Sequence, residues 1–173
     1  VCYPSAPYRG LLELLELWPL VRAAVPEATL RCAYGWQVHN AMMAWGPRIR
    51  LKELQERIVR LLEQPGVQWM DRVSQCGVKD LLDTSRVWAY PCVFDEMLCS
   101  TAVRAQARGC RPVVYPRAAL QETVPDEAQH APLAPAPFAA AVVAALRDPY
   151  PQRDAARTRA LAFHEASIAA WET

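Results

Sequence analysis

Apolar residues recur at helical spacing in two stretches of the N-terminal part of the chain. Residues 11–25 repeat leucine on one side and predict an amphipathic helix, bent or interrupted at Pro19. Residues 48–64 carry isoleucine and leucine largely on one face and predict a second helix. Between them, residues 28–34 alternate apolar side chains with smaller or polar ones, which predicts a strand that ends at the turn residue Gly35.

The alternation of strands and helices continues at shorter spacing. Predicted strands cover residues 67–73, 86–91 and 112–116, and predicted helices cover residues 77–85 and 101–108. We expect Ser100 or Thr101 to cap the second of these helices and Gly109 to end it in the left-handed conformation. Two alanine-rich helical runs, 138–147 and 154–172, follow a loop at 125–137 that is expected to be irregular and exposed.

Strands that alternate with helices imply right-handed crossover connections and a parallel sheet covered on both faces. The sequence therefore predicts an α/β fold with a Rossmann-like parallel sheet flanked by helices. A length of 173 residues suits one domain. We interpret residues 1–173 as that domain, with residues 138–173 as a helical tail that packs on it.

Charge and hydropathy narrow the classes of ligand. A formal net charge of +1 provides no broad field to attract nucleic acid, so an anionic ligand must be held by a few local donors. The longest apolar stretch, residues 131–146, is broken by three prolines and is shorter than the ~20 residues of a membrane span. No nucleic acid partner and no membrane span are predicted.

Cysteine usage and the start of the chain suggest a compartment and a larger context. The six cysteines form no CxxC pair and several lie in apolar segments, which favours buried thiols in a reducing cytosol over disulfides. We expect a cytoplasmic protein, or one at the inner face of the membrane. The chain lacks an initiator methionine and a signal region, and is interpreted as an excised or C-terminal part of a longer protein.

In open parallel sheets, ligands bind at the carboxyl ends of the strands, where loops and helix N-termini present unpaired backbone N–H groups. The loops at those ends are residues 5–11, 34–37, 71–75, 91–100 and 116–123. Arg9 and Gly10 stand where a helix begins and combine a cation, a close-approach glycine and unpaired amides, which suits a phosphate group. The alternative is an arginine that only meets solvent.

Two long segments resemble one known family. The segment WAYPCVFDEMLCSTAVRAQARGCRPVV, residues 88–114, and the opening YPSAPYRGLLELLELWPLVRAAVPEATLRCAYGW, residues 3–36, are similar to the C-terminal domain of family 4 glycosyltransferases, which have the two-domain GT-B architecture. The closing ASIAAWE, residues 166–172, extends the likeness over nearly the whole chain. The resemblance implies the nucleotide-sugar-binding half of such an enzyme, whose N-terminal GT-B domain lies outside this sequence.

The resemblance also implies roles for individual residues. Arg9 matches the basic residue that contacts the donor diphosphate, and Glu96 matches the acid that faces the donor sugar; these two are the expected catalytic residues. Arg104 stands where a second acid contacts the ribose. The remaining residues implied to contact or border the donor are Ser5, Gly10, Gly35, Arg72, Met97, Leu98 and Cys99.

Some residues depart from the family pattern. Arg104 is cationic and cannot accept ribose hydrogen bonds, although it could pair with Glu96 or reach a phosphate. Tyr8 replaces the usual aspartate, Asp71 the usual glycine, and Cys92 a usual threonine or serine. These changes leave the predicted fold intact and put full activity in question.

Other chemistry has weaker support in the sequence. His39, His130 and His164 lie far apart without zinc-helix spacing, so surface or supporting roles are preferred to metal ligation. Cys99 is interpreted as a buried thiol rather than a nucleophile. The tryptophans are assigned to packing, with Trp36 the plausible neighbour of a base or sugar.

The first hypothesis is therefore the donor domain of a retaining glycosyltransferase, with retention implied by the resemblance alone. It would move a sugar from a nucleotide diphosphate to a carbohydrate or lipid-linked acceptor, without metal or cofactor, and this part alone would transfer nothing. The alternatives are a non-catalytic GT-B-like scaffold, which Arg104 favours, and a nucleotide-sugar epimerase of the same plan.

Overall fold

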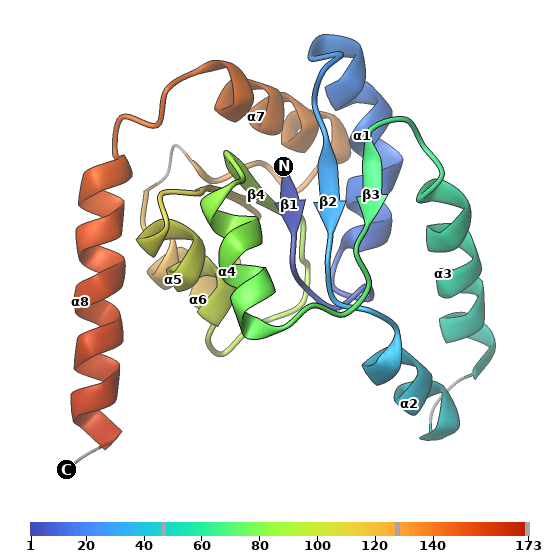
Figure 1. Ribbon diagram of the computed structural model, residues 1–173, viewed down its shortest axis with the longest axis horizontal. Coiled ribbons are helices and arrows are strands. Elements are labelled where there is room, and N and C mark those ends of the chain that lie inside the picture. Colours follow the sequence, from blue (N-terminus) through green and yellow to red (C-terminus); the bar gives the residue numbers. More distant parts are fainter. Residues whose placement is uncertain (46–47, 127–128, 172–173) are drawn as a thin grey trace.

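The computed structural model shows an α/β domain with five parallel strands in one sheet (Figure 1). It describes residues 1–45, 48–126 and 129–171, without the side chains of residues 42–49, 164 and 166–171. The spatial order of the strands is β3-β2-β1-β4-β5. Their bounds are β1 Cys2–Tyr3, β2 Leu30–Cys32, β3 Val67–Trp69, β4 Val87–Tyr90 and β5 Arg111–Val114. The predicted fold class is confirmed.

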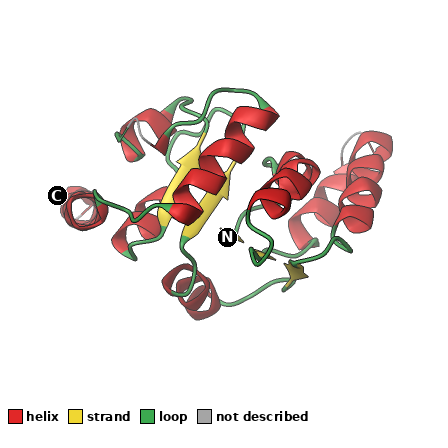
Figure 2. Cartoon of the chain, turned by 90° about the horizontal axis from the view of Figure 1, so that it is seen from above, coloured by secondary structure: helices red, strands yellow, loops and turns green. Residues whose placement is uncertain are grey.

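Helices cover both sides of the strands (Figure 2). On one side α1 packs against α3 and α7, and on the other α5 packs against α8. The helices are α1 Leu11–Ala24, α2 Gln37–Trp45, α3 Arg48–Leu61, α4 Gln75–Asp83, α5 Ser100–Ala107, α6 Ala119–Thr123, α7 Pro135–Arg147 and α8 Arg153–Trp171. The chain moves along the sheet in one direction from β1 to β3 and in the opposite direction from β3 to β5. Right-handed crossovers, as predicted from the sequence, would therefore place the connecting helices on opposite faces of the sheet.

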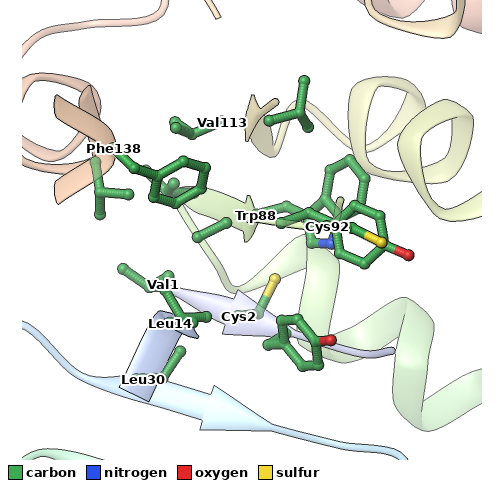
Figure 3. Packing of buried hydrophobic residues seen from close by; sticks show 14 of the residues in the cluster. Val1, Cys2, Leu14, Leu30, Trp88, Cys92, Val113 and Phe138 are labelled. Carbon is green, nitrogen blue, oxygen red and sulfur yellow. The ribbon is translucent and has the colours of Figure 1, made fainter. Parts of the chain in front are cut away.

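The core lies between the sheet and the helices and is rich in bulky side chains. Trp88 is 0% exposed, and Leu14 and Phe138 pack into the same cluster from α1 and α7 (Figure 3). All four residues of β4 are buried, as expected for a central parallel strand that is covered on both faces. This packing fixes the carboxyl ends of β1 and β4, from which the candidate site is built.

Helix α1 continues through Pro19 and is not interrupted there, contrary to one of the two outcomes expected from the sequence. Proline has no N–H, so the carbonyl of Leu15, four residues earlier, loses its helical partner. The side-chain amide of Gln64 donates to that carbonyl at 2.9 Å. Gln64, in the turn that follows α3, therefore replaces the hydrogen bond that Pro19 removes.

Other expectations about local structure need correction. Helices α2 and α6 were not predicted. Cys99 is the N-cap residue of α5 and makes no side-chain cap bond, whereas Ser100 is already helical. Residues 125–137 are not a wholly exposed loop, because Gln129 is 2% exposed and α7 begins at Pro135, a residue suited to the first turn of a helix. Gly109 has φ +70° after α5, as predicted.

The helical tail divides as predicted, into α7 and α8, and α8 packs along α5. Residue 172 of the ASIAAWE segment and the side chains of residues 166–171 lie outside the described part of the chain. Among the described residues, no helix combines the length and the apolar character that crossing a membrane requires.

Candidate functional site

The strand order creates one position where neighbouring connections diverge. From β1 the chain proceeds through α1 to β2 and β3, and it then crosses to β4 on the other side of β1. The loops after β1 and β4 therefore leave the sheet side by side and turn to opposite faces. Such a switch point at the carboxyl ends of parallel strands is where this class of sheet binds its ligands.

Arg9 reaches this switch point from the loop before α1. Its backbone N–H donates to the carbonyl of Ala6 at 2.9 Å, which closes a turn. The guanidinium donates through Nη1 to Oε1 of Glu96 and lies 4.9 Å from the centre of the Phe94 ring. The carboxylate raises the pKa of Arg9 further above its usual high value, so the group is a permanent cation.

Glu96 comes from the loop after β4 and is held from several directions. Its side chain is 9% exposed. Oε1 accepts from the hydroxyl of Tyr90 at 2.6 Å as well as from Arg9. The backbone carbonyl of Glu96 accepts from the N–H of Ala119 at 3.2 Å, which ties this loop to the start of α6. A carboxylate so placed can accept a hydrogen bond from a ligand through its second oxygen.

Gly10 allows the two loops to approach each other. It has φ +98° and forms the N-cap of α1. A Cβ atom at this position would lie 2.8 Å from the carbonyl carbon of Pro91, closer than real Cβ contacts. Glycine is therefore required both by the left-handed backbone and by the proximity of the β4–α5 loop.

The structure separates the ten predicted site residues into groups. Arg9, Gly10 and Glu96 lie together at the switch point, and Ser5 is buried in the same β1–α1 loop. Met97, Leu98 and Cys99 continue the loop from Glu96, with Met97 97% exposed and Cys99 buried.

Gly35 and Arg72 lie together at a different place, beyond the ends of β2 and β3. A Cβ at Gly35 would be 3.1 Å from Cβ of Arg72. The neighbouring Trp36 stacks on Trp69 with ring centres 5.3 Å apart, so its ring face is used in packing. This pair of loops borders the switch point through β2, the neighbour of β1 in the sheet.

Arg104 points to a third location. Its guanidinium donates to Oε1 of Gln75 on α4 at 2.7 Å. A groove of about 810 Å³ lies between α4, α5 and α8, and Leu98, Ser100 and Arg104 line it. Pairing of Arg104 with Glu96, which the sequence left open, is not observed; the partner is Gln75, because this face of α5 is turned to α4.

The remaining candidates from the sequence have structural roles. The six cysteines are free thiols, five of them buried and Cys76 exposed. Burial raises the pKa of Cys99 to about 12, which does not suit a nucleophile. No group of side chains suited to holding a metal occurs among the described residues.

Two of the three histidines can be placed. His39 is 0% exposed, which excludes the surface role and leaves the supporting one, and its Nε2 lies 2.9 Å from the carbonyl of Leu51. Nε2 of His130 lies 2.6 Å from the carbonyl of Val124. The side chain of His164 lies outside the described residues. Each placed histidine therefore binds backbone rather than a common ligand.

Tyr90 is a residue of the site that was not predicted from the sequence. It is the last residue of β4 and bonds directly to Glu96. The available signal was its place, since an aromatic residue that ends a buried strand just before Pro91 stands at the ligand-binding edge of a parallel sheet. Phe94, whose ring contacts Arg9 from the loop after β4, was also not predicted.

The fold matches that of a known enzyme. A glycosyltransferase from Rickettsia africae ESF-5, known from its crystal structure, is similar to this chain with a TM-score of 0.71 at 18% sequence identity. The match covers 92% of this chain and 42% of that one, so the chain spans less than half the length of the protein it resembles. No protein-family model and no curated protein matches the sequence. The chain therefore has a glycosyltransferase-like, Rossmann-like α/β fold.

Proposed function

We propose that this chain is the donor domain of a retaining GT-B glycosyltransferase of the family 4 type and binds a nucleotide-diphosphate sugar at the β1/β4 switch point. The observation that carries the proposal is the meeting of Arg9 and Glu96 there, from loops 87 positions apart in the sequence. One side chain is a cation suited to a diphosphate, and the other is an acceptor suited to sugar hydroxyls. The glycosyltransferase-like fold supports this assignment.

In glycosyl transfer, the diphosphate gathers negative charge as the glycosidic bond breaks. Arg9, together with the positive end of the α1 helix dipole, would stabilise that charge. Glu96 would accept hydrogen bonds from the sugar and hold it in one orientation. Since a GT-B cleft forms between two domains, an N-terminal domain would bind the carbohydrate or lipid-linked acceptor. This chain alone would bind the donor without transferring its sugar.

Calorimetric titration with the diphosphates of uridine, guanosine and adenosine tests the proposal. We expect one of them to bind, and we expect Arg9→Ala to weaken that binding at least about tenfold, since a charge-assisted hydrogen bond contributes ~1.5–3 kcal/mol. Arg60→Ala is the matched control, because Arg60 is exposed on α3 away from the site and should bind like the original chain. Equal affinity of the Arg9 and Arg60 variants would contradict the proposed site.

A non-catalytic scaffold is the second candidate, and two observations favour it. Arg104 replaces an acid and is bonded to Gln75, and the only charged group of the phosphate site, Arg9, is already paired with Glu96 within the described part of the chain. A ligand must therefore compete with an internal ion pair. If the folded chain binds none of the three diphosphates, the scaffold is the better assignment.

A further inference from the structure

Two hydrogen-bond donors of different character share one oxygen of Glu96. Oε1 accepts from Nη1 of Arg9 and, at 2.6 Å, from the hydroxyl of Tyr90. No protein partner of Oε2 is recorded within the described part of the chain, and the side chain retains 9% exposure. The carboxylate is thus fixed at one oxygen and available at the other.

Tyr90 is the more rigid of the two donors. It is 1% exposed and ends β4, an interior strand of the sheet. Its ring stacks on Trp88 with centres 5.0 Å apart and an interplanar angle of 21°. The ring of Tyr3, from β1, lies 6.0 Å away on centres. Rotation of the phenol would disrupt the packed core, so the hydroxyl has one position.

Arg9 is the more mobile donor. Its side chain is 28% exposed, it comes from a loop, and besides Glu96 it contacts the exposed ring of Phe94. A diphosphate carries more negative charge than one carboxylate and can offer two oxygens to the planar guanidinium. An arriving diphosphate would therefore draw Arg9 from Glu96, whereas a neutral phenol gains nothing from following it.

We propose that Tyr90 is a positioning residue, whose hydroxyl holds Oε1 of Glu96 in place while Arg9 exchanges the carboxylate for the donor diphosphate. Oε2 then stays turned to the sugar. This inference rests on the proposed donor site and adds a division of labour to it. Arg9 binds the diphosphate and Glu96 contacts the sugar. Tyr90 keeps the contact between Glu96 and the sugar independent of the contact between Arg9 and the diphosphate.

Burial and the neighbouring carboxylate raise the pKa of Tyr90 well above its usual value. The phenol therefore stays protonated and donates throughout the neutral range. Because the phenol is neutral, the diphosphate does not draw it away from Glu96 as it would draw a cation.

Removal of one hydroxyl tests the positioning role. Tyr90→Phe keeps the ring stack and loses only the bond to Glu96. The matched control is Tyr115→Phe, since Tyr115 is also 1% exposed and also donates to a glutamate, but to Glu13 on α1 rather than to Glu96. Both variants are titrated with the nucleoside diphosphate that binds and with its glucose conjugate.

We expect Tyr90→Phe to weaken binding of the sugar conjugate about five- to tenfold while the affinity for the diphosphate changes less than about twofold, because only the sugar contact depends on Glu96. Tyr115→Phe should change neither. An equal loss for both ligands, or the same effect in Tyr115→Phe, would overturn the positioning role.

A second measurement needs no nucleotide and so separates the two proposals. The side-chain carboxyl carbon of Glu96 is observed by NMR in the ligand-free chain and assigned with Glu96→Gln. In Arg9→Ala, we expect the signal to stay sharp and near its original position. In Arg9→Ala/Tyr90→Phe, it should move to the position of a solvated glutamate. Release of Glu96 by Arg9→Ala alone would refute the role of Tyr90, while failure of every diphosphate to bind would refute the donor site.

Discussion

Replacement of Gly10 by alanine would test how closely the β1–α1 and β4–α5 loops approach. Gly10 has φ +98°, and an added Cβ would lie 2.8 Å from the carbonyl carbon of Pro91. Pro91 contributes backbone at this contact, and backbone cannot rotate away as a side chain can. The clash is relieved only if α1 or the loop that carries Glu96 moves.

The expected cost has three parts. The left-handed backbone costs an alanine ~1–2 kcal/mol, and the lower entropy of the unfolded chain returns ~0.4–1 kcal/mol. Overlap with packed backbone adds ~1–3 kcal/mol, as overpacked cores show. The free energy of unfolding should therefore fall by about 1–5 kcal/mol, with a central value of about 3 kcal/mol.

Gly109→Ala is the matched control. Gly109 has φ +70°, but a Cβ there would meet the side chain of Arg153, which can move. Its cost should be only about 1 kcal/mol, from the backbone alone. Urea unfolding followed by circular dichroism measures both variants. If Gly10→Ala costs no more than Gly109→Ala, the close approach of the two loops is refuted.

Two further predictions concern the buried ionisable groups. With Ellman's reagent, the native chain should show one fast thiol, the exposed Cys76, and the other five should react only after unfolding. The variant Cys76→Ser should lack the fast phase. A fast phase that persists in this variant would contradict the burial of the other thiols. Burial raises the pKa of Tyr3 and Tyr90, so the stability that their neutral phenols provide is present below the unfolded pKa of ~10 and lost as the pH rises above it. The phenolate absorbance of Tyr3 and Tyr90 should therefore appear together with loss of the near-ultraviolet circular dichroism. Ionisation of all the tyrosines in a chain that keeps this circular dichroism would contradict the prediction.

The sequence predicted those parts of the fold that depend on local pattern. Residues 87–90 form a continuous apolar run before Pro91, and β4 is found there. Helix α2 was missed although Val38, Ala41, Met42 and Trp45 have the i, i+3, i+4, i+7 spacing of a helix. Helix α6 was missed because its five residues are too short to show a period. Pro19 was misleading because the group that replaces its hydrogen bond, Gln64, is distant in sequence.

The candidate site was predictable in its residue types but not in its arrangement. The loop composition indicated Arg9, the resemblance to family 4 glycosyltransferases indicated Glu96, and these two side chains form an ion pair. Their roles toward a donor stay predictions. The partner of Arg104 and the bond from Tyr90 depend on which face of α5 meets α4 and on how β4 ends, neither of which follows from local periodicity.

The separation of Arg9 and Glu96 by 87 positions has a consequence for how the chain matures. The contact between the two side chains cannot form from local structure alone, because β4 must first pair with β1. A polypeptide that ends before β4 would contain Arg9 and α1 but would lack Glu96 and Tyr90. Capture of a diphosphate during refolding should therefore come late, after the most distant strand pairing of the central sheet.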